Sequence, residues 1–378
     1  MVSAAGEAHR LAARPVPGGA GGAAGAHENF VWHRGRSLTS SRTWGLISAL
    51  QRGHHDAPVA RVHALLADAA AHYRDALRAS PQAVRYLLGR GISGATAARF
   101  GLGFARPKWR DLGPVLQRYD EGTTLASGLL AVSGDGPHAR RFDRFRDRLM
   151  FPIRNRAGGV AGFGGRVIVG EGGPKYLNSP EGVAFRKGEL LYGLYEAQHA
   201  IQVDGLAVLV EGYLDVVSVA QSGFAPVVGM LGTTCSREQI SELLTLAPRL
   251  VFCFDGDKAG QRAAERALKT VLPLASDTCT IEFVLLPEDH DPDSFVRAHG
   301  LEGFQAALAS ATPLADFLIQ CASAGCDLQY PEGRARCAHR ARPLWHLLPD
   351  GNVRSSLANY CAGMLRFSMD ELLDLWHR

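Results

Sequence analysis

Six acidic residues follow three apolar segments of the chain. Their carboxylates could bind metal ions if the fold brings them together. The acidic residues are Glu211, Asp215, Asp255, Asp257, Asp291 and Asp293. The apolar segments before them are 207–210, 250–254 and 280–286, and each has the length and composition of a buried strand. If these strands are parallel, their carboxyl ends meet at one edge of a sheet, and the acidic side chains converge there.

Converging carboxylates repel one another unless a cation lies between them. Mg²⁺ suits such a position because it binds a few carboxylate oxygens and keeps room for water and phosphate oxygens. Metal ions of this kind are common in phosphoryl transfer. A structural alternative stays open for four of the acids, each of which could cap a helix: Asp215, Asp257, Asp291 and Asp293. Glu211 ends a buried strand, where an acid needs a partner. The pattern therefore predicts a Mg²⁺ site, with Mn²⁺ as the other candidate ion.

Alternating strands and helices over 204–300 would position these acids. The pattern predicts strands at 206–210, 226–230, 250–254 and 280–286 and helices at 215–221, 236–246, 258–274 and 293–299. Such alternation is typical of a mostly parallel sheet with helices on its faces.

The flanking segments have different patterns. Residues 1–58 are rich in Gly, Ala and Arg without a regular period, and we interpret them as a disordered leader. Residues 59–203 combine helices with short strands, including a hairpin of 149–153 with 160–163. Residues 301–378 show helical periodicity only. The predicted fold class is therefore α+β, with a mixed N-terminal subdomain, a central α/β domain with a parallel sheet, and a C-terminal helical subdomain.

The composition excludes several classes of protein. The 378 residues are 46% hydrophobic and 21% charged, as expected for a folded chain rather than a disordered one. No run of apolar residues is long enough to span a membrane, and the N-terminus lacks the pattern of a secretory signal. All seven cysteines lie at Cys235 or beyond, without a C-x-x-C pair. We therefore predict a cytoplasmic protein with reduced thiols, no membrane contact and no bound zinc.

The segment 140–166 is the most basic part of the chain, with eight arginines against two aspartates. Arginine matches the geometry of phosphate groups. We expect Arg144, Arg146 and Arg148 to contact a nucleic-acid template or a nucleotide. A solvated charged surface is the alternative.

Longer motifs resemble a known family. The segments 210–215, 231–233 and 254–260 resemble a Toprim domain, a fold shared by bacterial primases, topoisomerases and some nucleases. Upstream, four further segments look like the catalytic core of DnaG-type bacterial DNA primases: 143–153, 162–166, 175–181 and 185–188. The resemblance covers roughly residues 60–378.

This resemblance implies synthesis of short RNA primers from ribonucleoside triphosphates on single-stranded DNA, within the primosome during DNA replication. Glu211, Asp255 and Asp257 would be catalytic, and all six acids would bind Mg²⁺. The resemblance also adds nucleotide or primer–template contacts at Arg166, Lys175, Asn178 and Lys187. Two rival hypotheses stay open, a Toprim nuclease and a catalytically weak primase relic that binds single-stranded DNA.

Members of this family usually begin with a zinc-binding domain and end with a helical domain that binds the replicative helicase. Residues 1–58 contain no cysteine, so we expect no zinc-binding domain. We interpret 301–378 as the helical part of the core, so we also expect no helicase-binding domain. A helicase or another replisome protein would then bind through a surface that the sequence does not identify.

Overall fold

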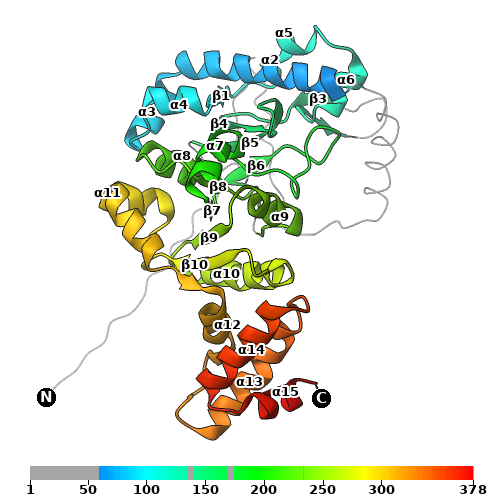
Figure 1. Cartoon of the computed structure of the whole chain (residues 1–378). Helices are drawn as coiled ribbons and strands as arrows, with labels where there is room; N and C mark the ends of the chain where they lie inside the picture. The colour runs from blue at the N-terminus through cyan, green and yellow to red at the C-terminus, as the bar shows by residue number, and fades with distance from the viewer. Residues whose placement is uncertain (1–58, 135–139, 169–173, 233, 378) are drawn as a thin grey trace, which may run out of the picture. The chain divides into compact units, whose positions relative to one another are not determined.

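Helices and strands alternate through the part of the chain that this computed structural model describes (Figure 1). The description covers residues 59–134, 140–168, 174–232 and 234–377. The predicted leader, 1–58, lies outside the described residues. Among the helices of the described ranges, none is long and apolar enough to cross a membrane.

The N-terminal region is built on the long helix α2 (Val59–Arg78), whose buried side chains recur at helical spacing along one face. Helix α2 packs on an antiparallel sheet with the strand order β1–β4–β5–β6 (Figure 1). These strands are β1 (Gly103–Ala105), β4 (Arg148–Arg154), β5 (Val160–Val167) and β6 (Tyr176–Asn178). The predicted hairpin is confirmed as β4 and β5, and β5 continues beyond its expected end.

Shorter elements complete this region. They are α3 (Pro81–Gly89), α4 (Gly94–Arg99), α5 (Gly113–Leu116), α6 (Glu121–Ala126), β2 (Leu130–Ser133) and β3 (Arg140–Asp143). Strands β2 and β3 form a separate two-stranded antiparallel sheet. The last residue of β3, Asp143, fixes the loop before α5. Its N–H donates to the Trp109 carbonyl oxygen at 2.9 Å, and its carboxylate accepts from the Leu112 N–H at 2.8 Å.

The central sheet has the strand order β11–β10–β9–β7–β8. Its strands are β7 (Leu206–Val210), β8 (Val227–Gly229), β9 (Arg249–Phe254), β10 (Thr280–Leu285) and β11 (Thr312–Pro313). The first four are parallel, and β11 joins β10 antiparallel. The four parallel strands predicted from the sequence are confirmed, each with its ends within one residue of the expected bounds.

Helices cover both faces of this sheet. They are α7 (Leu194–Asp204), α8 (Tyr213–Gln221), α9 (Arg237–Leu246), α10 (Lys258–Val271) and α11 (Pro292–Ala309). Along β7, Ala207 and Leu209 pack with side chains of α7, α9 and α10. The alternate residues Val208 and Val210 pack with α8, α11 and Phe151 of the N-terminal sheet. This shared core holds the N-terminal sheet beside the central one.

Four helices follow the central sheet: α12 (Leu314–Ser323), α13 (Pro331–Trp345), α14 (Asn352–Leu365) and α15 (Met369–His377). They pack around Trp345 and Trp376, whose ring centres are 5.0 Å apart. Phe317 of α12 stacks on Phe283 of β10 at 4.2 Å and joins these helices to the sheet. The predicted α+β fold class is thus confirmed.

Candidate active site

Acidic residues gather where the parallel strands end. Glu211 follows β7 and Asp255 follows β9, while Asp291 ends the loop after β10. The Glu211 carboxylate accepts a hydrogen bond from the Asp255 N–H at 3.4 Å. Gly256 lets the β9 loop approach the β10 loop closely, because a Cβ there would lie 2.0 Å from the Pro287 carbonyl oxygen. The loops therefore bring acids from three strands to one edge of the sheet.

Burial and mutual repulsion raise the pKa values of these carboxyl groups. Burial raises the pKa of Asp255 to about 7, and the neighbouring Glu211 and Asp291 carboxylates contribute to this rise. Burial also raises the pKa of Glu211. For Asp215, burial and then the charge of Asp291 raise the pKa well above its usual range. The positive charges of Lys175 near Asp255 and of Arg266 near Glu211 lower the pKa values of these two acids but do not offset the rise.

A divalent cation fits this arrangement. The Asp255 Oδ1 atom is buried and has no hydrogen-bond partner among the described residues, which is unfavourable for a polar atom. In the described ranges, no group of three His, Cys, Asp or Glu side chains could hold one ion alone. Mg²⁺ is usually bound through one or two carboxylates, with water and phosphate oxygens as its other ligands. Glu211 and Asp255, which are joined by the hydrogen bond from the Asp255 N–H, are the candidate pair for such an ion.

Two of the acids cap helices. Asp257 accepts hydrogen bonds from the N–H groups of Ala259 and Gly260 at the start of α10, at 2.8 and 2.7 Å. Asp291 accepts from the Ser294 N–H at the start of α11, at 2.7 Å. In each acid a single oxygen, Oδ1, makes these bonds. The capping alternative therefore leaves the second oxygen of each residue for another partner.

Asp293 has a different environment from the other acids. Its side chain is only 1% exposed. It accepts hydrogen bonds from Arg90 Nη1 at 2.7 Å, Arg297 Nε at 3.1 Å and Ser218 Oγ at 2.6 Å. Two arginines and a hydroxyl already stabilise this carboxylate, so the geometry argues against metal binding by Asp293. Its backbone N–H donates to Asp215 Oδ1 at 3.3 Å.

A cavity of about 450 Å³ opens beside these acids. Nine of the residues predicted from the sequence line it: Arg166, Lys175, Asn178, Lys187, Glu211, Asp215, Asp255, Asp291 and Asp293. Four predicted residues do not line it: Arg144, Arg146, Arg148 and Asp257. The cavity therefore has an acidic wall from the central sheet and a wall from the N-terminal region that carries the basic groups.

Hydrogen bonds and ring contacts hold the basic wall in place. Asn178 donates to the Leu231 carbonyl oxygen at 2.6 Å and accepts from the Tyr213 hydroxyl at 2.6 Å. It thereby ties β6 to the loop after β8. Arg166 donates to the Tyr176 hydroxyl, and its guanidinium lies 5.2 Å from the centre of that ring. Neighbouring groups thus fix the side chains of Asn178 and Arg166, while Lys175 and Lys187 are exposed.

The arginine-rich segment does not form one surface. Arg148 is buried and donates to the carbonyl oxygens of Gly165 and Pro174 at 3.1 and 3.0 Å. This geometry argues against a phosphate contact and favours a structural role for Arg148. Arg144 donates from Nε to the Asn178 carbonyl oxygen at 3.2 Å. It therefore helps to hold the backbone of Asn178, a residue of the basic wall.

Arg146 lies in an aromatic cluster away from the cavity. Its guanidinium carbon is 4.4 Å from the ring centre of Trp109 and 4.7 Å from that of Phe142. The two rings meet edge to face at 5.2 Å. Trp109 is 64% exposed, so this cluster presents a flat apolar face and a fixed positive charge to solvent.

Sequence reasoning missed four of these residues. Arg90, Tyr176 and Tyr213 line the cavity, and Trp109 forms the aromatic cluster. The two tyrosines lie inside the motifs that carry the family resemblance, so these motifs could have identified them as site residues. Arg90 stands between two glycines, a pattern that indicates only the end of a helix. Nothing in the sequence marks Trp109 as exposed.

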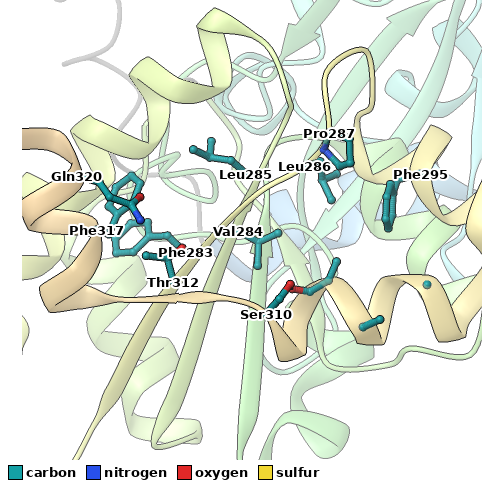
Figure 2. A pocket seen from close by; sticks show the side chains of 13 residues that line it. Phe283, Val284, Leu285, Leu286, Pro287, Phe295, Ser310, Thr312, Phe317 and Gln320 are labelled. Atoms are coloured by element: carbon teal, nitrogen blue, oxygen red, sulfur yellow. The ribbon is translucent and has the colours of Figure 1, made fainter. Parts of the chain in front are cut away.

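A larger cavity, of about 650 Å³, lies along β10 between α11 and α12 (Figure 2). Its 13 lining residues include no charged side chain and no histidine. Phe283 and Phe317 lie together on one side of it, while Phe295 lies apart, near Pro287 (Figure 2). This cavity has no charged side chain to bind a metal or neutralise a phosphate, so the smaller cavity, which has both acidic and basic side chains, is the candidate active site.

Family models match three successive parts of the chain. Residues 72–198 match the N-terminal domain of the DNA primase catalytic core, and 208–296 match a Toprim-like domain. Residues 315–370 match the DnaB-helicase binding domain of primase.

Solved structures agree with these matches. A crystal structure of a DNA primase domain from Pseudomonas aeruginosa has a TM-score of 0.79 and 42% sequence identity, and the similarity covers 84% of this chain and 100% of that one. This chain belongs to the family of DnaG-type DNA primase catalytic cores. A structure of the DnaG primase catalytic domain bound to ssDNA has a TM-score of 0.75 and 38% identity, over 85% of this chain and 99% of that one. The resemblance inferred from the motifs is thus confirmed.

Curated relatives extend further than the similarity does. The DNA primase of Pseudomonas aeruginosa is 43% identical over 340 residues, which are 86% of this chain and 50% of the relative. The DNA primase of Escherichia coli K12 is 41% identical over 295 residues, which are 77% of this chain and 50% of the relative. The chain thus spans about half the length of these curated relatives.

One expectation was wrong. We expected no helicase-binding domain, but the match at 315–370 covers most of α12–α15. Helical periodicity predicts helices without indicating which module they form. The stacking of Phe317 on Phe283 also gives these helices a common core with the central sheet. The sequence therefore offered no boundary between the two.

Proposed function

We propose that this chain synthesises short RNA primers from ribonucleoside triphosphates on a single-stranded DNA template. The observation that carries this proposal is the cavity whose two walls bear opposite charge. Carboxylates line one wall, and Arg166, Lys175 and Lys187 line the other. The reaction is attack of a 3′-hydroxyl oxygen on the α-phosphorus of a nucleotide, with pyrophosphate as the leaving group. Such a reaction depends on positioning and on neutralising phosphate charge.

The basic wall would bind the triphosphate. Lys175 and Lys187 each offer a compact charge with three N–H donors, and Arg166 offers a planar guanidinium held by Tyr176. Because Tyr176 already holds Arg166, this side chain loses little conformational freedom when a phosphate binds. The wall would hold the α-phosphorus opposite the acidic edge of the central sheet.

The acidic wall would hold the metal and receive the proton. Glu211 and Asp255 would bind Mg²⁺, or Mn²⁺ in its place, with Asp257 and Asp291 as further candidate ligands through their second oxygens. When bound, the ion supplies charge neutralisation at the reacting phosphate. Burial raises the pKa of Glu211, which makes its carboxylate a stronger base, and it would also accept the proton of the attacking hydroxyl.

A primer-synthesis assay on single-stranded DNA with labelled ribonucleotides and Mg²⁺ tests this proposal. We expect Asp255→Asn to lower incorporation by at least about 100-fold, as the loss of a group that stabilises transition-state charge does. The matched control is Asp75→Asn, which removes a 73% exposed carboxylate from a surface ion pair with Arg78. Full incorporation by Asp255→Asn would overturn the site assignment. Cleavage of the DNA without RNA synthesis would favour the nuclease hypothesis instead.

The aromatic cluster of Trp109, Phe142 and Arg146 would bind the template strand. Bases stack on exposed aromatic rings whatever their sequence, and an arginine beside the ring binds the backbone phosphate. The structure of the DnaG primase catalytic domain bound to ssDNA is that of a relative with the same fold. The hydrogen bonds of Asp143 fix the Trp109 loop against β3, so the ring is presented on a rigid support.

Substitutions in this cluster separate stacking from charge. Trp109→Ala should weaken single-stranded DNA binding by roughly tenfold, since one stacked base contributes about 1–3 kcal/mol. Arg146→Ala should lower the slope of log K against log salt by about 0.7. Tyr330→Ala removes another aromatic ring, 61% exposed, and should leave DNA affinity unchanged. Equal effects of Trp109→Ala and Tyr330→Ala would contradict this template path.

Residues 315–370 would bind the replicative helicase, as the family match suggests. Met364 of α14 is 47% exposed and offers an apolar contact. Met364→Asp should weaken binding of the purified helicase in a calorimetric titration while primer synthesis by the chain alone is retained.

All seven cysteines are free thiols, which supports a cytoplasmic location for the protein.

A further inference from the structure

The Asp293 carboxylate joins three segments that are far apart in the sequence. Arg90 comes from the turn after α3, 203 residues before Asp293. Ser218 lies in α8, and Arg297 lies one helical turn further along α11. The charge at Asp293 therefore fixes the position of an N-terminal arginine relative to the central sheet.

Arg90 connects this buried cluster to the cavity. Its side chain is 29% exposed and lines the cavity together with Arg166, Lys175 and Lys187. The guanidinium also lies 5.8 Å from the Tyr86 ring centre. An arginine carries five N–H donors, so a hydrogen bond from Nη1 to Asp293 leaves others for a phosphate group.

Resting on the proposed function, we infer that Asp293 is a positioning residue that holds Arg90 at the cavity to bind the phosphates of the incoming nucleotide. Asp293 is then not a ligand of the ion. A carboxylate has about four acceptor sites, and Asp293 already accepts four hydrogen bonds, from Arg90, Ser218 and two nitrogens of Arg297, so it would have to give up one to bind a metal. Arg90, in contrast, gains from the pair, because an arginine held in place loses less conformational freedom on binding a phosphate.

Metal binding and nucleotide binding, measured separately on the full chain, test this inference. Mn²⁺ binding without nucleotide and ATP binding with Mn²⁺ can each be followed by calorimetry. Asp255→Asn should weaken Mn²⁺ binding. Arg90→Ala and Asp293→Asn should leave Mn²⁺ affinity within about twofold of wild type and weaken ATP binding by about tenfold each, the usual effect of losing a charge-assisted hydrogen bond.

A double-variant cycle and a matched control complete the test. Asp293→Asn with Arg90→Ala should be no worse for ATP than Arg90→Ala alone, because both act through one contact. Arg297→Ala removes the other arginine from Asp293 and should weaken ATP binding less than twofold. In primer extension, Arg90→Ala should raise KM for the nucleotide more than it lowers kcat.

The outcomes separate this inference from the proposed function. Loss of Mn²⁺ affinity in Asp293→Asn as large as in Asp255→Asn would overturn it, as would additive effects in the double variant or equal effects of Arg297→Ala and Arg90→Ala. If Asp293→Asn fails to fold, Arg90→Ala still decides, because it leaves no acid of the site altered. Wild-type protein that binds neither Mn²⁺ nor ATP would refute the proposed function itself.

Discussion

The loops after β9 and β10 carry the same Asp-x-Asp spacing, but the structure uses the two pairs differently. After β9, Asp255 follows the strand at once and stays at the sheet edge, and Asp257 caps α10. After β10 a loop intervenes, so Asp291 takes the cap of α11 and Asp293 falls inside its first turn. There Asp293 is buried against Arg90.

The point where each helix starts decides these roles. A cap residue has extended backbone, which turns its side chain toward the N–H groups of its own helix. A residue in the first turn points instead toward whatever packs against the helix, which for Asp293 is Arg90 and Ser218. The shared Asp-x-Asp spacing thus makes all four aspartates candidate metal ligands in the sequence. Only their place relative to the helix start separates the proposed metal-binding acids from Asp293, which holds an arginine.

The largest expected difference between the two loops is in stability without metal. Asp293→Ala should lower the free energy of unfolding by about 3 kcal/mol, because it leaves the partly buried Arg90 and the buried Ser218 hydroxyl without their partner. Asp255→Asn should leave stability unchanged or raise it, because it removes a charge that neighbouring carboxylates repel. Urea unfolding of the metal-free variants measures both values. Equal losses in the two variants would contradict the separation of roles.

Much of this comparison could be predicted from the sequence. The acids at the ends of β7, β9 and β10 follow from strand–helix alternation and from the rule that parallel strands end at one edge. The partner of Asp293 could not be predicted, since Arg90 is 203 residues away and only the shared core of the two sheets brings them together. Local pattern contains no information about such a contact.

The arginine-rich segment shows the same limit. Composition predicted a basic surface, yet Arg148 enters the sheet and bonds to backbone carbonyl oxygens, while Arg146 stays outside between aromatic rings. A single residue separates them, but Arg148 begins β4 and Arg146 precedes it. Whether an arginine contacts solvent or backbone depends on where the strand begins, and charge content does not report that position.

The pH dependence of stability gives a smaller but more specific test of the β9 loop. The pKa of Asp255 in the folded, metal-free chain is about 7, above the value of about 3.9 for an unfolded Asp. A raised pKa means that the protonated form stabilises the fold. This contribution is complete below the unfolded pKa and is lost as the pH rises through the folded one.

We therefore expect the Tm of metal-free protein to fall between about pH 4 and about pH 7, the unfolded and folded pKa values of Asp255. Asp255→Asn should flatten this fall, because the amide does not titrate. Saturating Mg²⁺ should raise Tm more at the higher pH, where the carboxylate is ionised and can bind the ion. Thermal unfolding followed by circular dichroism measures these effects. A fall of the same size in Asp255→Asn would assign the pH dependence to other groups.

The smallest expected effects distinguish capping from metal binding at Asp257 and Asp291. Asn caps a helix nearly as well as Asp, so Asp257→Asn and Asp291→Asn should each lower stability by only a few tenths of a kcal/mol. The two Ala variants should each lose about 1 kcal/mol of unfolding free energy, because the cap itself is removed.

If the second oxygen of each acid binds the ion, the Asn variants should lose primer synthesis while keeping this stability. Urea unfolding and the incorporation assay on the same samples separate the two roles. Unchanged synthesis in Asp257→Asn would show that Asp257, the exposed acid outside the cavity, only caps α10, and would leave Asp255 as the only metal-binding acid of its pair.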